Sequence, residues 1–428
     1  MTIEVAIVGA GVAGLTAAIS LRKYVGSDVN MNIRIYERLD IGDTEQPRGR
    51  AEDHVAVAPR VGAALGLQGN GLQVLGQLDP RIRAAVEHGG FACRGFRFLT
   101  AGQWLLGSIA QPTTMISRGI LIKALRDALP SNLVHQRHVE QITVLSGQSP
   151  SLLLKGEEVP HRVDLLIGAD GIRSPTRHAI FGDDPSYHTE YSGSCAVGGF
   201  HSMPVPTDLI NQHSATFVYG STGFFGYSAL SAYTRDRLMY WSVYQSPLPE
   251  RDERLDLNQV DEMLRQRHGS WEDTVIQDII SKIKVENVWP IMFVPPLPSW
   301  GRDGAVLVGD AAHAMTPRSG QGASQGIEDA QTLAMLLAEQ LRLCPSKEEA
   351  IQKTIDDLYL LRKERVGRIH EQANTVKEPK LPMSRAQTWI LYALLFVMTK
   401  LSSFVDIFPR PGAWDAEAVV KSYLTRCT

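Results

Sequence analysis

The chain has 428 residues, of which 44% are hydrophobic, and a formal net charge of −3. It is long enough for two or three domains with a sizeable core, and its charge gives no reason to expect nucleic acid or an anionic membrane as a partner. The four cysteines are scattered without CxxC spacing, which indicates neither a disulfide framework nor a metal site.

Residues 3–24 have the pattern of a strand, a glycine-rich turn and a helix. The apolar run Ile3–Val8 leads into GxGxxG at Gly9, Gly11 and Gly14. In such a turn the first glycine permits a tight bend, the second lets the backbone approach a pyrophosphate, and the third allows the helix to pack closely on the strand.

A carboxylate at the end of the next strand completes this pattern. Residues 32–36 form the second predicted strand, and Glu37 follows it, placed to bind the hydroxyls of an adenosine ribose. Arg38 either lies over the adenine or is a solvated surface arginine. The pattern predicts a dinucleotide site but does not distinguish NAD from FAD.

Charged residues mark two further positions next to predicted helices. Residues 116–130 predict a helix with one apolar face, and Arg118 lies at its start. A cation interacts unfavourably with the helix dipole there, so Arg118 is expected to have another role. After the predicted strand 163–167, Asp170 either binds the cofactor region or caps the turn. Arg173 and Arg177 are either surface residues or contacts for a pyridine-nucleotide phosphate.

Residues 186–286 differ in character from the flanking sequence. Several stretches alternate or run apolar with aromatic residues, as antiparallel strands do. We expect this insertion to form a substrate domain whose sheet roofs the cofactor and whose inward-facing aromatic side chains line an apolar pocket. The predicted strands are residues 194–200, 215–219, 226–230 and 237–244, followed by a helix at 257–267.

The segment Gly309–Ala330, GDAAHAMTPRSGQGASQGIEDA, lies between a predicted buried strand and a predicted helix. Asp310, at the carboxyl end of the strand, is placed to accept hydrogen bonds from a polyol. Gly320 and Gly322 allow the backbone to pass close to a flat ring. The amides near Ala323, at the helix start, offer partial positive charge to an anion.

The motifs GxGxxG, DG and GD, in this order, resemble those of the single-component FAD-dependent monooxygenases with the para-hydroxybenzoate hydroxylase fold, of the kind that tailors natural products. The run GDAAHxxxPxxGQG is long and unusual, and the chain has a single GxGxxG, whereas disulfide reductases have a second one for NADPH. The resemblance implies an α/β Rossmann-like FAD-binding domain with an inserted antiparallel β-sheet substrate domain and a C-terminal helical tail.

The expected domains follow from the motif positions. The discontinuous FAD-binding domain comprises residues 1–80, 101–185 and 287–375, the substrate-binding domain comprises 81–100 and 186–286, and the helical segment comprises 376–428.

The resemblance also assigns roles to individual residues. It implies that Arg118 contacts the FAD, that the loop at Gly62 and Ala63 moves with the flavin unless it is a plain glycine-rich turn, and that the backbone of Pro317 lies beside the reacting edge of the flavin. His313 is expected to be a packing residue and not a base. The predicted cofactor-binding residues are Gly9, Gly11, Ala13, Gly14, Glu37, Arg38, Gly62, Ala63, Arg118, Asp170, Asp310, Gly320, Gly322 and Ala323.

The chain departs from the family pattern in the substrate domain. Many aromatic hydroxylases of this type have YxGxxAxRG on the first strand, with an arginine that helps to hold a phenolate. Here the sequence is YSGSCAVGG, with Gly198 at the position of the arginine. Tyr227 matches a tyrosine that some members use with that arginine, so it is a candidate catalytic residue, with a core tyrosine as the alternative.

The implied activity is that of a flavin monooxygenase. Bound FAD is reduced by transient NADPH or NADH, and reduced flavin reacts with O2 to give a C4a-hydroperoxide that hydroxylates or epoxidises an electron-rich aromatic, indole-like or alkene substrate. The absent arginine favours neutral multi-ring compounds over simple phenols. The alternatives are a reductase of double bonds with the same fold and a non-catalytic flavin-binding protein.

The C-terminal region is predicted to be helical. The charged helix at residues 356–373 is expected to present a solvated face or to form intramolecular pairs. The apolar segment 389–398 is too short to span a bilayer and is expected to be a packing helix or, as the alternative, a surface anchor. We expect a cytoplasmic protein, and the pattern leaves the oligomeric state open.

Overall fold

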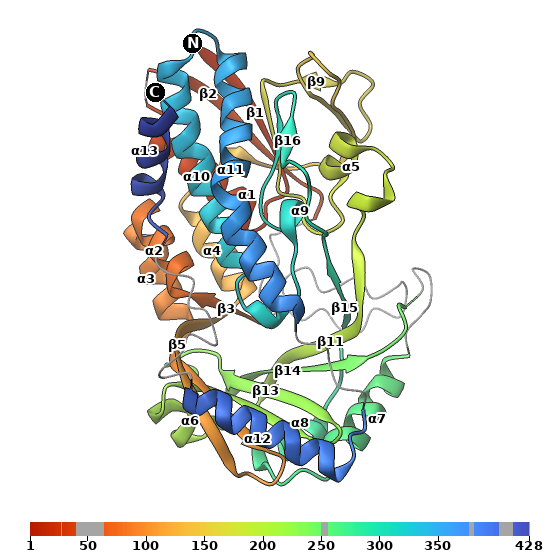
Figure 1. Ribbon diagram of the computed structural model, residues 1–428. Coiled ribbons are helices and arrows are strands. Elements are labelled where there is room, and N and C mark those ends of the chain that lie inside the picture. The colour runs from red at the N-terminus through yellow and green to blue at the C-terminus, as the bar shows by residue number, and fades with distance from the viewer. Residues whose placement is uncertain (27, 40–63, 250–255, 376–380, 402–413, 428) are drawn as a thin grey trace.

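The computed structural model describes residues 1–26, 28–39, 64–249, 256–375, 381–401 and 414–427. Gly62 and Ala63 therefore lie outside the described residues. Two large sheets organise the rest, one near the end where both termini lie and one at the opposite end (Figure 1).

The first sheet has six strands in the order β16-β17-β10-β1-β2-β6 and is parallel except between β16 and β17. Ile7 on β1 pairs with Ile35 on one side and Ile167 on the other. The central strands are apolar because both faces of the sheet are covered. The strands are β1 (Thr2–Val8), β2 (Asn30–Glu37), β6 (Val134–Gln136), β10 (Leu165–Gly168), β16 (Gly301–Arg302) and β17 (Ala305–Leu307).

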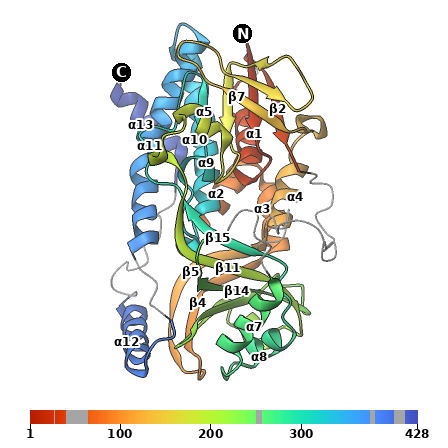
Figure 2. The same ribbon diagram turned by 90° about the vertical axis from the view of Figure 1, so that its right-hand side faces the viewer.

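Helices cover one side of this sheet, and a small three-stranded sheet with α5 lies on the other (Figures 1 and 2). The helices of this part of the molecule, on either side of the sheet, are α1 (Val12–Tyr24), α2 (Gly69–Leu78), α3 (Pro80–Gly89), α4 (Arg118–Asp127), α5 (Pro175–Phe181), α9 (Asp310–His313), α10 (Gly322–Leu343), α11 (Lys347–Thr375) and α13 (Ala416–Cys427). The small sheet comprises β7 (Val139–Thr143), β8 (Ser151–Leu154) and β9 (His161–Arg162).

The second sheet has eight strands in the order β15-β11-β14-β13-β12-β4-β5-β3, with β12 and β4 parallel. Helices α7 (Leu257–His268) and α8 (Thr274–Lys282) pack on one face, and α12 (Arg385–Leu401) lies on the other (Figure 2). The strands are β3 (Ala64–Gln68), β4 (Phe91–Thr100), β5 (Leu105–Ser117), β11 (Glu190–Ser202), β12 (Ser214–Gly220), β13 (Gly223–Ala229), β14 (Arg237–Gln245) and β15 (Val288–Phe293).

This architecture confirms the expected fold class: an α/β part built on the first sheet, an inserted sheet and C-terminal helices. The second sheet, however, also takes β3, β5 and β15, which the predicted division assigned to the nucleotide-binding part. These strands belong to it because their backbones join its hydrogen-bonded ladder, a long-range pairing that the local sequence pattern does not contain.

Candidate functional site

The turn after β1 is shaped by glycines that admit no side chain. Gly9 has φ +102°, and a Cβ atom there would lie 2.4 Å from the carbonyl oxygen of Ala169. A Cβ atom on Gly14 would lie 2.0 Å from the carbonyl oxygen of Gly9, so α1 packs directly on the turn. Gly11 is the N-cap of α1, which has no side-chain cap, so this helix start is open to an anion.

Glu37 is placed under this turn, at the end of β2. Its Oε2 accepts a hydrogen bond from the amide of Ala10 (2.9 Å) and its Oε1 one from the amide of Leu39 (2.9 Å). Each oxygen keeps a second acceptor site, so the carboxylate can also take ribose hydroxyls. Arg38 is exposed beside it.

Arg118 faces the same turn from the other side. It is the first residue of α4 and is exposed, and its Nη2 lies 3.8 Å from the position that a Cβ atom on Gly11 would occupy. A cation next to the open start of α1 is the arrangement that a pyrophosphate requires.

Asp170 caps α5. Its Oδ2 accepts hydrogen bonds from the amide (2.9 Å) and the hydroxyl (2.7 Å) of Thr176, and burial raises its pKa. Its Oδ1 is buried without a hydrogen-bond partner among the described residues, which leaves one acceptor for a ligand or water. Arg177 is buried and donates to the carbonyl oxygens of Ala311 (2.9 Å) and Ile172 (2.6 Å), so it ties α5 to α9 and is not a surface arginine.

The GD segment brings a carboxylate to the start of α10, a buried helix that packs on α1 and α11. Asp310 is exposed, and its Oδ1 lies 3.8 Å from the position of a Cβ atom on Gly322. Gly320 has φ +59°, and Gly322 and Ala323 are partly exposed at the first turn of α10, which has no side-chain cap. A polyol acceptor and a free helix start therefore lie side by side.

Buried amides hold the loop in front of α10. Gln321 is 2% exposed, and its side chain binds Gln68 and accepts a hydrogen bond from Asn70 Nδ2 (3.1 Å). Gln68 also donates to the carbonyl oxygen of Ser319 (3.3 Å). The loop that would contact a flat ring is thus fixed from beneath by β3 and α2.

A buried charge network continues from Asn70 into the protein. Asn70 donates to Glu328 (2.6 Å), which also binds Arg362 Nη1 (2.6 Å) and Arg365 (2.8 Å). Arg362 Nε donates to Asp329 (2.9 Å), and Glu328, Asp329 and Arg362 are all fully buried. Two carboxylates and two guanidiniums balance here, which offsets the cost of burying each charge.

Asp329 connects this network to the GD segment. Its Oδ2 accepts a hydrogen bond from the amide of Gly309 (3.0 Å) and is hydrogen-bonded to His313 Nε2 (2.6 Å). Burial alone would raise its pKa, but the charges of His313 and Arg362 and these hydrogen bonds lower it to about 2. His313 is therefore engaged with a buried carboxylate and packs against Trp300.

Five aromatic side chains form what we call the aromatic wall on the face of the second sheet opposite α7 and α8. Strand alternation places them on one face, because Phe217 pairs with Phe98 on β4 and with Gly226, which in turn pairs with Trp241. Ring centroids of Phe217 and Trp241 lie 5.5 Å apart. The members are Phe98, Phe217, Tyr219, Phe224 and Trp241, of which all but Phe98 are partly exposed.

Gly198 lies within this wall, paired with Trp241. A Cβ atom on Gly226 would lie 2.2 Å from the indole of Trp241, so the ring lies across that glycine. A Cβ atom on Gly198 would be 3.5 Å from Trp241 Cβ and 2.8 Å from the carbonyl oxygen of Tyr240. At the position of the family arginine, a side chain would therefore meet the backbone of Tyr240, and the indole of Trp241 lies beside it.

The Pro317–Ser319 turn, η3, precedes α10 and is held at Ser319, whose carbonyl oxygen accepts the hydrogen bond from Gln68. Pro317 and Arg318 are exposed. Burial raises the pKa of Tyr219 to about 12, while the charge of Arg318 acts in the opposite direction.

Tyr227 projects from the other face of the sheet. It is buried, and its hydroxyl donates to Asp273 Oδ2 (2.9 Å), the carboxylate whose Oδ1 caps α8. Burial, followed by the charge of Asp273, raises its pKa. These contacts favour the core alternative for Tyr227, because its phenol is directed away from the aromatic wall.

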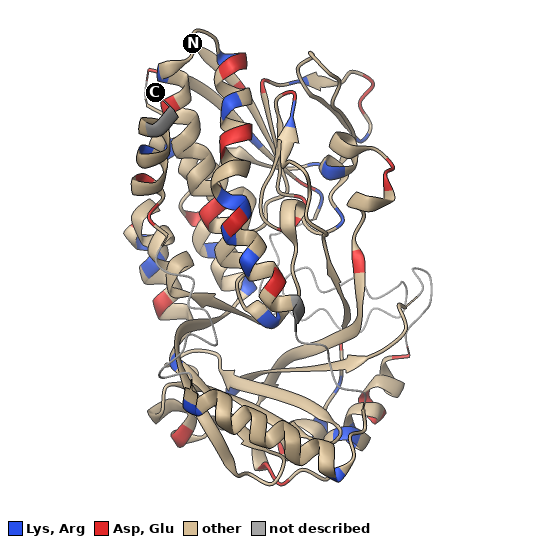
Figure 3. Cartoon of the chain, in the orientation of Figure 1, with Lys and Arg blue, Asp and Glu red and all other residues tan. Residues whose placement is uncertain are grey.

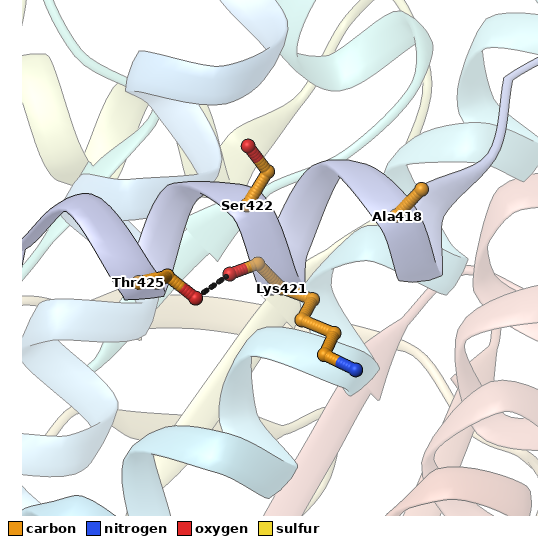
Figure 4. A pocket seen from close by; sticks show the side chains of 4 residues that line it. All are labelled: Ala418, Lys421, Ser422 and Thr425. Atoms are coloured by element: carbon orange, nitrogen blue, oxygen red, sulfur yellow. Dashed lines mark hydrogen bonds between the residues drawn. The ribbon is translucent and has the colours of Figure 1, made fainter.

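Other polar features lie apart from this site. A hollow on α13 is lined by Ala418, Lys421, Ser422 and Thr425, where Thr425 donates to the carbonyl oxygen of Lys421 (2.8 Å) (Figure 4). His178, Asp183 and His188, all exposed, form a group with metal-ligand spacing beyond α5 among the described residues.

The described residues fit FAD. The glycine turn at Gly9 and the uncapped starts of α1 and α10 form cradles that a Cβ atom or a capping side chain would fill. An exposed carboxylate, Asp310, and an exposed guanidinium, Arg118, face these cradles, and Asp170 Oδ1 offers an unpaired acceptor.

The residues that sequence reasoning missed are those beneath the loop, namely Gln68, Asn70, Gln321, Glu328 and Asp329. The sequence predicted for Arg362 only that it lies on a charged helix with either a solvated face or intramolecular pairs. The structure confirms the second alternative, because Arg362 pairs with Glu328 and Asp329. The one local sequence feature that indicated a buried polar network was the run of polar residues in GQGASQGIEDA. Polar residues at the start of an apolar helix are buried with it and require hydrogen-bond partners.

Comparisons with known proteins identify the family and the fold. A family profile described as FAD binding domain matches residues 123–355. Salicylate hydroxylase from Pseudomonas putida is 28% identical over 357 residues, which cover 79% of this chain and 77% of that protein. Chloroplastic zeaxanthin epoxidase from Solanum lycopersicum is 26% identical over 390 residues, which cover 86% of this chain and 53% of that protein.

A solved structure shows the same fold. Klebsiella pneumoniae HpxO, complexed with FAD and uric acid, superimposes with a TM-score of 0.72 at 18% identity, covering 99% of this chain and 97% of that one.

Proposed function

We propose a reaction on the premise that this chain belongs to the FAD binding domain family and is a single-component FAD-dependent monooxygenase. With NAD(P)H and dioxygen, it hydroxylates or epoxidises a neutral, electron-rich ring or alkene. The observation that carries the proposal is the aromatic wall with glycine at position 198. A wall of partly exposed rings binds an apolar ring by burial and stacking, and it has a glycine at position 198, where family members have the arginine that holds a phenolate.

The residues that would hold FAD divide its parts among them. Glu37 takes the ribose, Arg118 and the start of α1 take the pyrophosphate, Asp310 takes the ribityl hydroxyls, and the start of α10 at Gly322 stabilises negative charge on the ring. When bound, FAD supplies hydride acceptance and activation of dioxygen. The protein contributes placement, and the aromatic wall keeps water from the reacting edge near Pro317.

Both reaction types stay within the proposal. The relatives are named for a hydroxylation and for an epoxidation. Each reaction requires that an electron-rich carbon of the substrate is held against the flavin. The aromatic wall can hold the substrate there, and neither reaction needs an acid–base pair of side chains.

The test is NADPH oxidation by the FAD-loaded protein with neutral multi-ring compounds and, as the matched comparison, anionic phenolates of similar size. We expect neutral compounds to accelerate NADPH oxidation and to give products that carry one oxygen atom from labelled dioxygen. Reoxidation with stoichiometric peroxide for every compound would favour the double-bond reductase. Failure of NADPH to reduce the flavin would favour a non-catalytic binding protein.

A further inference from the structure

Helix α12 packs on the second sheet through a mixed inner side, on which Leu391, Tyr392 and Leu395 lie beside two buried threonines. Its buried residues are Thr388, Leu395 and Thr399, and the threonine hydroxyls donate to backbone carbonyl oxygens, Thr399 to that of Leu106 on β5 (3.0 Å). A surface helix of a globular protein normally buries its apolar stripe and exposes its polar one. On α12, apolar residues lie on the outer side as well as on the inner side.

The outward side of α12 is apolar along its length. Ile390, Leu394, Val397 and Leu401 follow the i, i+4, i+7, i+11 spacing of one helix face. Their exposed fractions are between 45% and 60%, and those of Trp389 and Phe396 are 59% and 48%. Isolated exposed apolar residues are ordinary, but a contiguous stripe of this kind marks a contact surface.

The turn between β4 and β5 extends this surface. Trp104 is 65% exposed, and its ring lies 6.0 Å from that of Trp389. The support is close-packed, because a Cβ atom on Gly107 would lie 2.0 Å from Thr399 Oγ1. We call the seven residues the apolar face: Trp104, Trp389, Ile390, Leu394, Phe396, Val397 and Leu401.

Charge on α12 is confined to its ends and is positive. The helix contains no aspartate or glutamate, and Arg385 and Lys400 are exposed at its two ends, so its middle is uncharged in Figure 3. Glu272, which approaches Gly102 at the base of the neighbouring turn, adds one carboxylate to the rim. The net charge of the chain does not reveal this local pattern.

We infer that the apolar face docks on the surface of a lipid bilayer, with α12 lying in the plane of the interface. Tryptophans beside an apolar stripe with basic residues at its ends are the composition of an interfacial helix, and anionic headgroups complement Arg385 and Lys400. A twofold contact between two copies would instead bring two α12 helices together. Neither helix has an acidic residue that could pair with Arg385 or Lys400 of the other copy, so this contact lacks the charge complementarity that anionic lipid offers. Among the described residues no helix has the length and hydropathy that a bilayer span requires.

Docking would bring the aromatic wall close to the bilayer. Leu391, Tyr392 and Leu395 on the inner side of α12 pack with Phe98, and the Tyr392 hydroxyl donates to the carbonyl oxygen of Tyr219 (3.0 Å). An apolar substrate dissolved in lipid would then be one helix away from the wall. This consequence rests on the proposed function, whereas the docking itself does not.

The test is flotation of the full-length, FAD-loaded protein with vesicles of phosphatidylcholine, alone or mixed with phosphatidylserine. We expect the protein to float with vesicles, several-fold more with phosphatidylserine, and the double variant Ile390→Ser/Leu394→Ser to bind at least about tenfold less tightly. The matched control is Leu145→Ser/Val159→Ser, which alters two exposed apolar residues outside the apolar face (50% and 74% exposed) and is expected to float like the parent protein. FAD content and melting temperature verify that each variant folds.

Two further measurements separate the outcomes. Lipids brominated on the acyl chain are expected to quench tryptophan fluorescence, and Trp104→Phe/Trp389→Phe is expected to remove most of this quenching. Light scattering without lipid reports the oligomeric state. Absence of flotation overturns the inference, and if the same Ile390→Ser/Leu394→Ser variant dissociates a dimer, the apolar face belongs to a second copy of the chain. Neither readout depends on turnover, so a failed substrate search does not affect it.

Discussion

The guanidinium carbon of Arg362 lies 4.5 Å from the ring centre of Trp414, so the segment before α13 covers the buried charge network. Arg365 lies 5.2 Å from the same ring, and the indole Nε1 donates to Thr332 on α10 (3.1 Å). The C-terminal segment therefore completes the support beneath the GD loop, although it is far from that loop in sequence.

Replacement of Arg362 by methionine is expected to lower the free energy of unfolding by about 3–5 kcal/mol, because it leaves Glu328 and Asp329 buried without their main counter-ion. Urea unfolding followed by circular dichroism measures this change. The matched control is Arg368→Met on the same helix, where the side chain is exposed, and we expect a change within about 0.5 kcal/mol. Equal losses in both variants would contradict the importance of the network.

Substitutions at Trp414 separate its ring from its hydrogen bond. Trp414→Phe keeps a ring over the guanidiniums and loses the bond to Thr332, at a cost of about 1 kcal/mol. Trp414→Ala also removes the buried ring and is expected to cost about 3–5 kcal/mol. The same unfolding measurement applies, and similar losses for the two variants would mean that the hydrogen bond dominates.

Asp329 predicts a defined loss of stability in acid. Its pKa in the folded protein is about 2, below its ordinary value of 3.8, so the ionised carboxylate stabilises the fold fully above pH about 4. This contribution, about 2 kcal/mol, is lost as the pH falls through about 2. Asp329→Asn is expected to be less stable at neutral pH and to show a correspondingly shallower decline between pH about 4 and about 2 in thermal unfolding. An unchanged slope would show that other carboxylates account for the acid transition.

Gly226→Ala is expected to displace Trp241 from the aromatic wall, because the new Cβ atom would lie 2.2 Å from a rigid ring. We expect a loss of about 1–3 kcal/mol in unfolding free energy. The double variant Gly226→Ala/Trp241→Ala removes the clash, so its loss should be smaller than the sum of the two single losses. Simple additivity would indicate that the ring moves aside without cost.

Asp310→Ala is expected to weaken FAD binding by about ten- to a hundredfold, since a charge-assisted hydrogen bond to the cofactor contributes about 1.5–3 kcal/mol. Titration of the apoprotein with FAD, followed by flavin fluorescence, measures this affinity. Asp183→Ala, at a carboxylate that is 92% exposed and apart from the site, serves as control and should bind like the parent protein. Equal affinities for all three proteins would remove Asp310 from the FAD site.

Local patterns predicted the parts of the site that local sequence determines. The strand, turn and helix around Gly9 and the loop before α10 lie where the glycines and apolar runs indicated. Their conformations depend on residues within a few positions, such as the positive φ of Gly320.

Long-range partners could not be predicted in this way. The charged pattern of α11 is the same for a solvated helix and for one that buries Arg362, since the partners Glu328 and Asp329 lie on another helix. The predicted strand 226–230 contained Tyr227 but did not assign its side chain to a face, and the hydrogen bond to Asp273 at the start of α8 shows that it faces away from the aromatic wall.

The order of strands in the first sheet has a consequence for folding during synthesis. β10 ends at Gly168, and its neighbour β17 begins only at Ala305, after the insertion that supplies most of the second sheet. The nucleotide-binding sheet therefore stays incomplete at one edge until the ribosome has released that insertion, and closing so long a loop slows the final pairing. During this interval β10 presents an open apolar edge, so a chaperone that covers strand edges should bind nascent chains ending between residues 168 and 305 more than the finished protein.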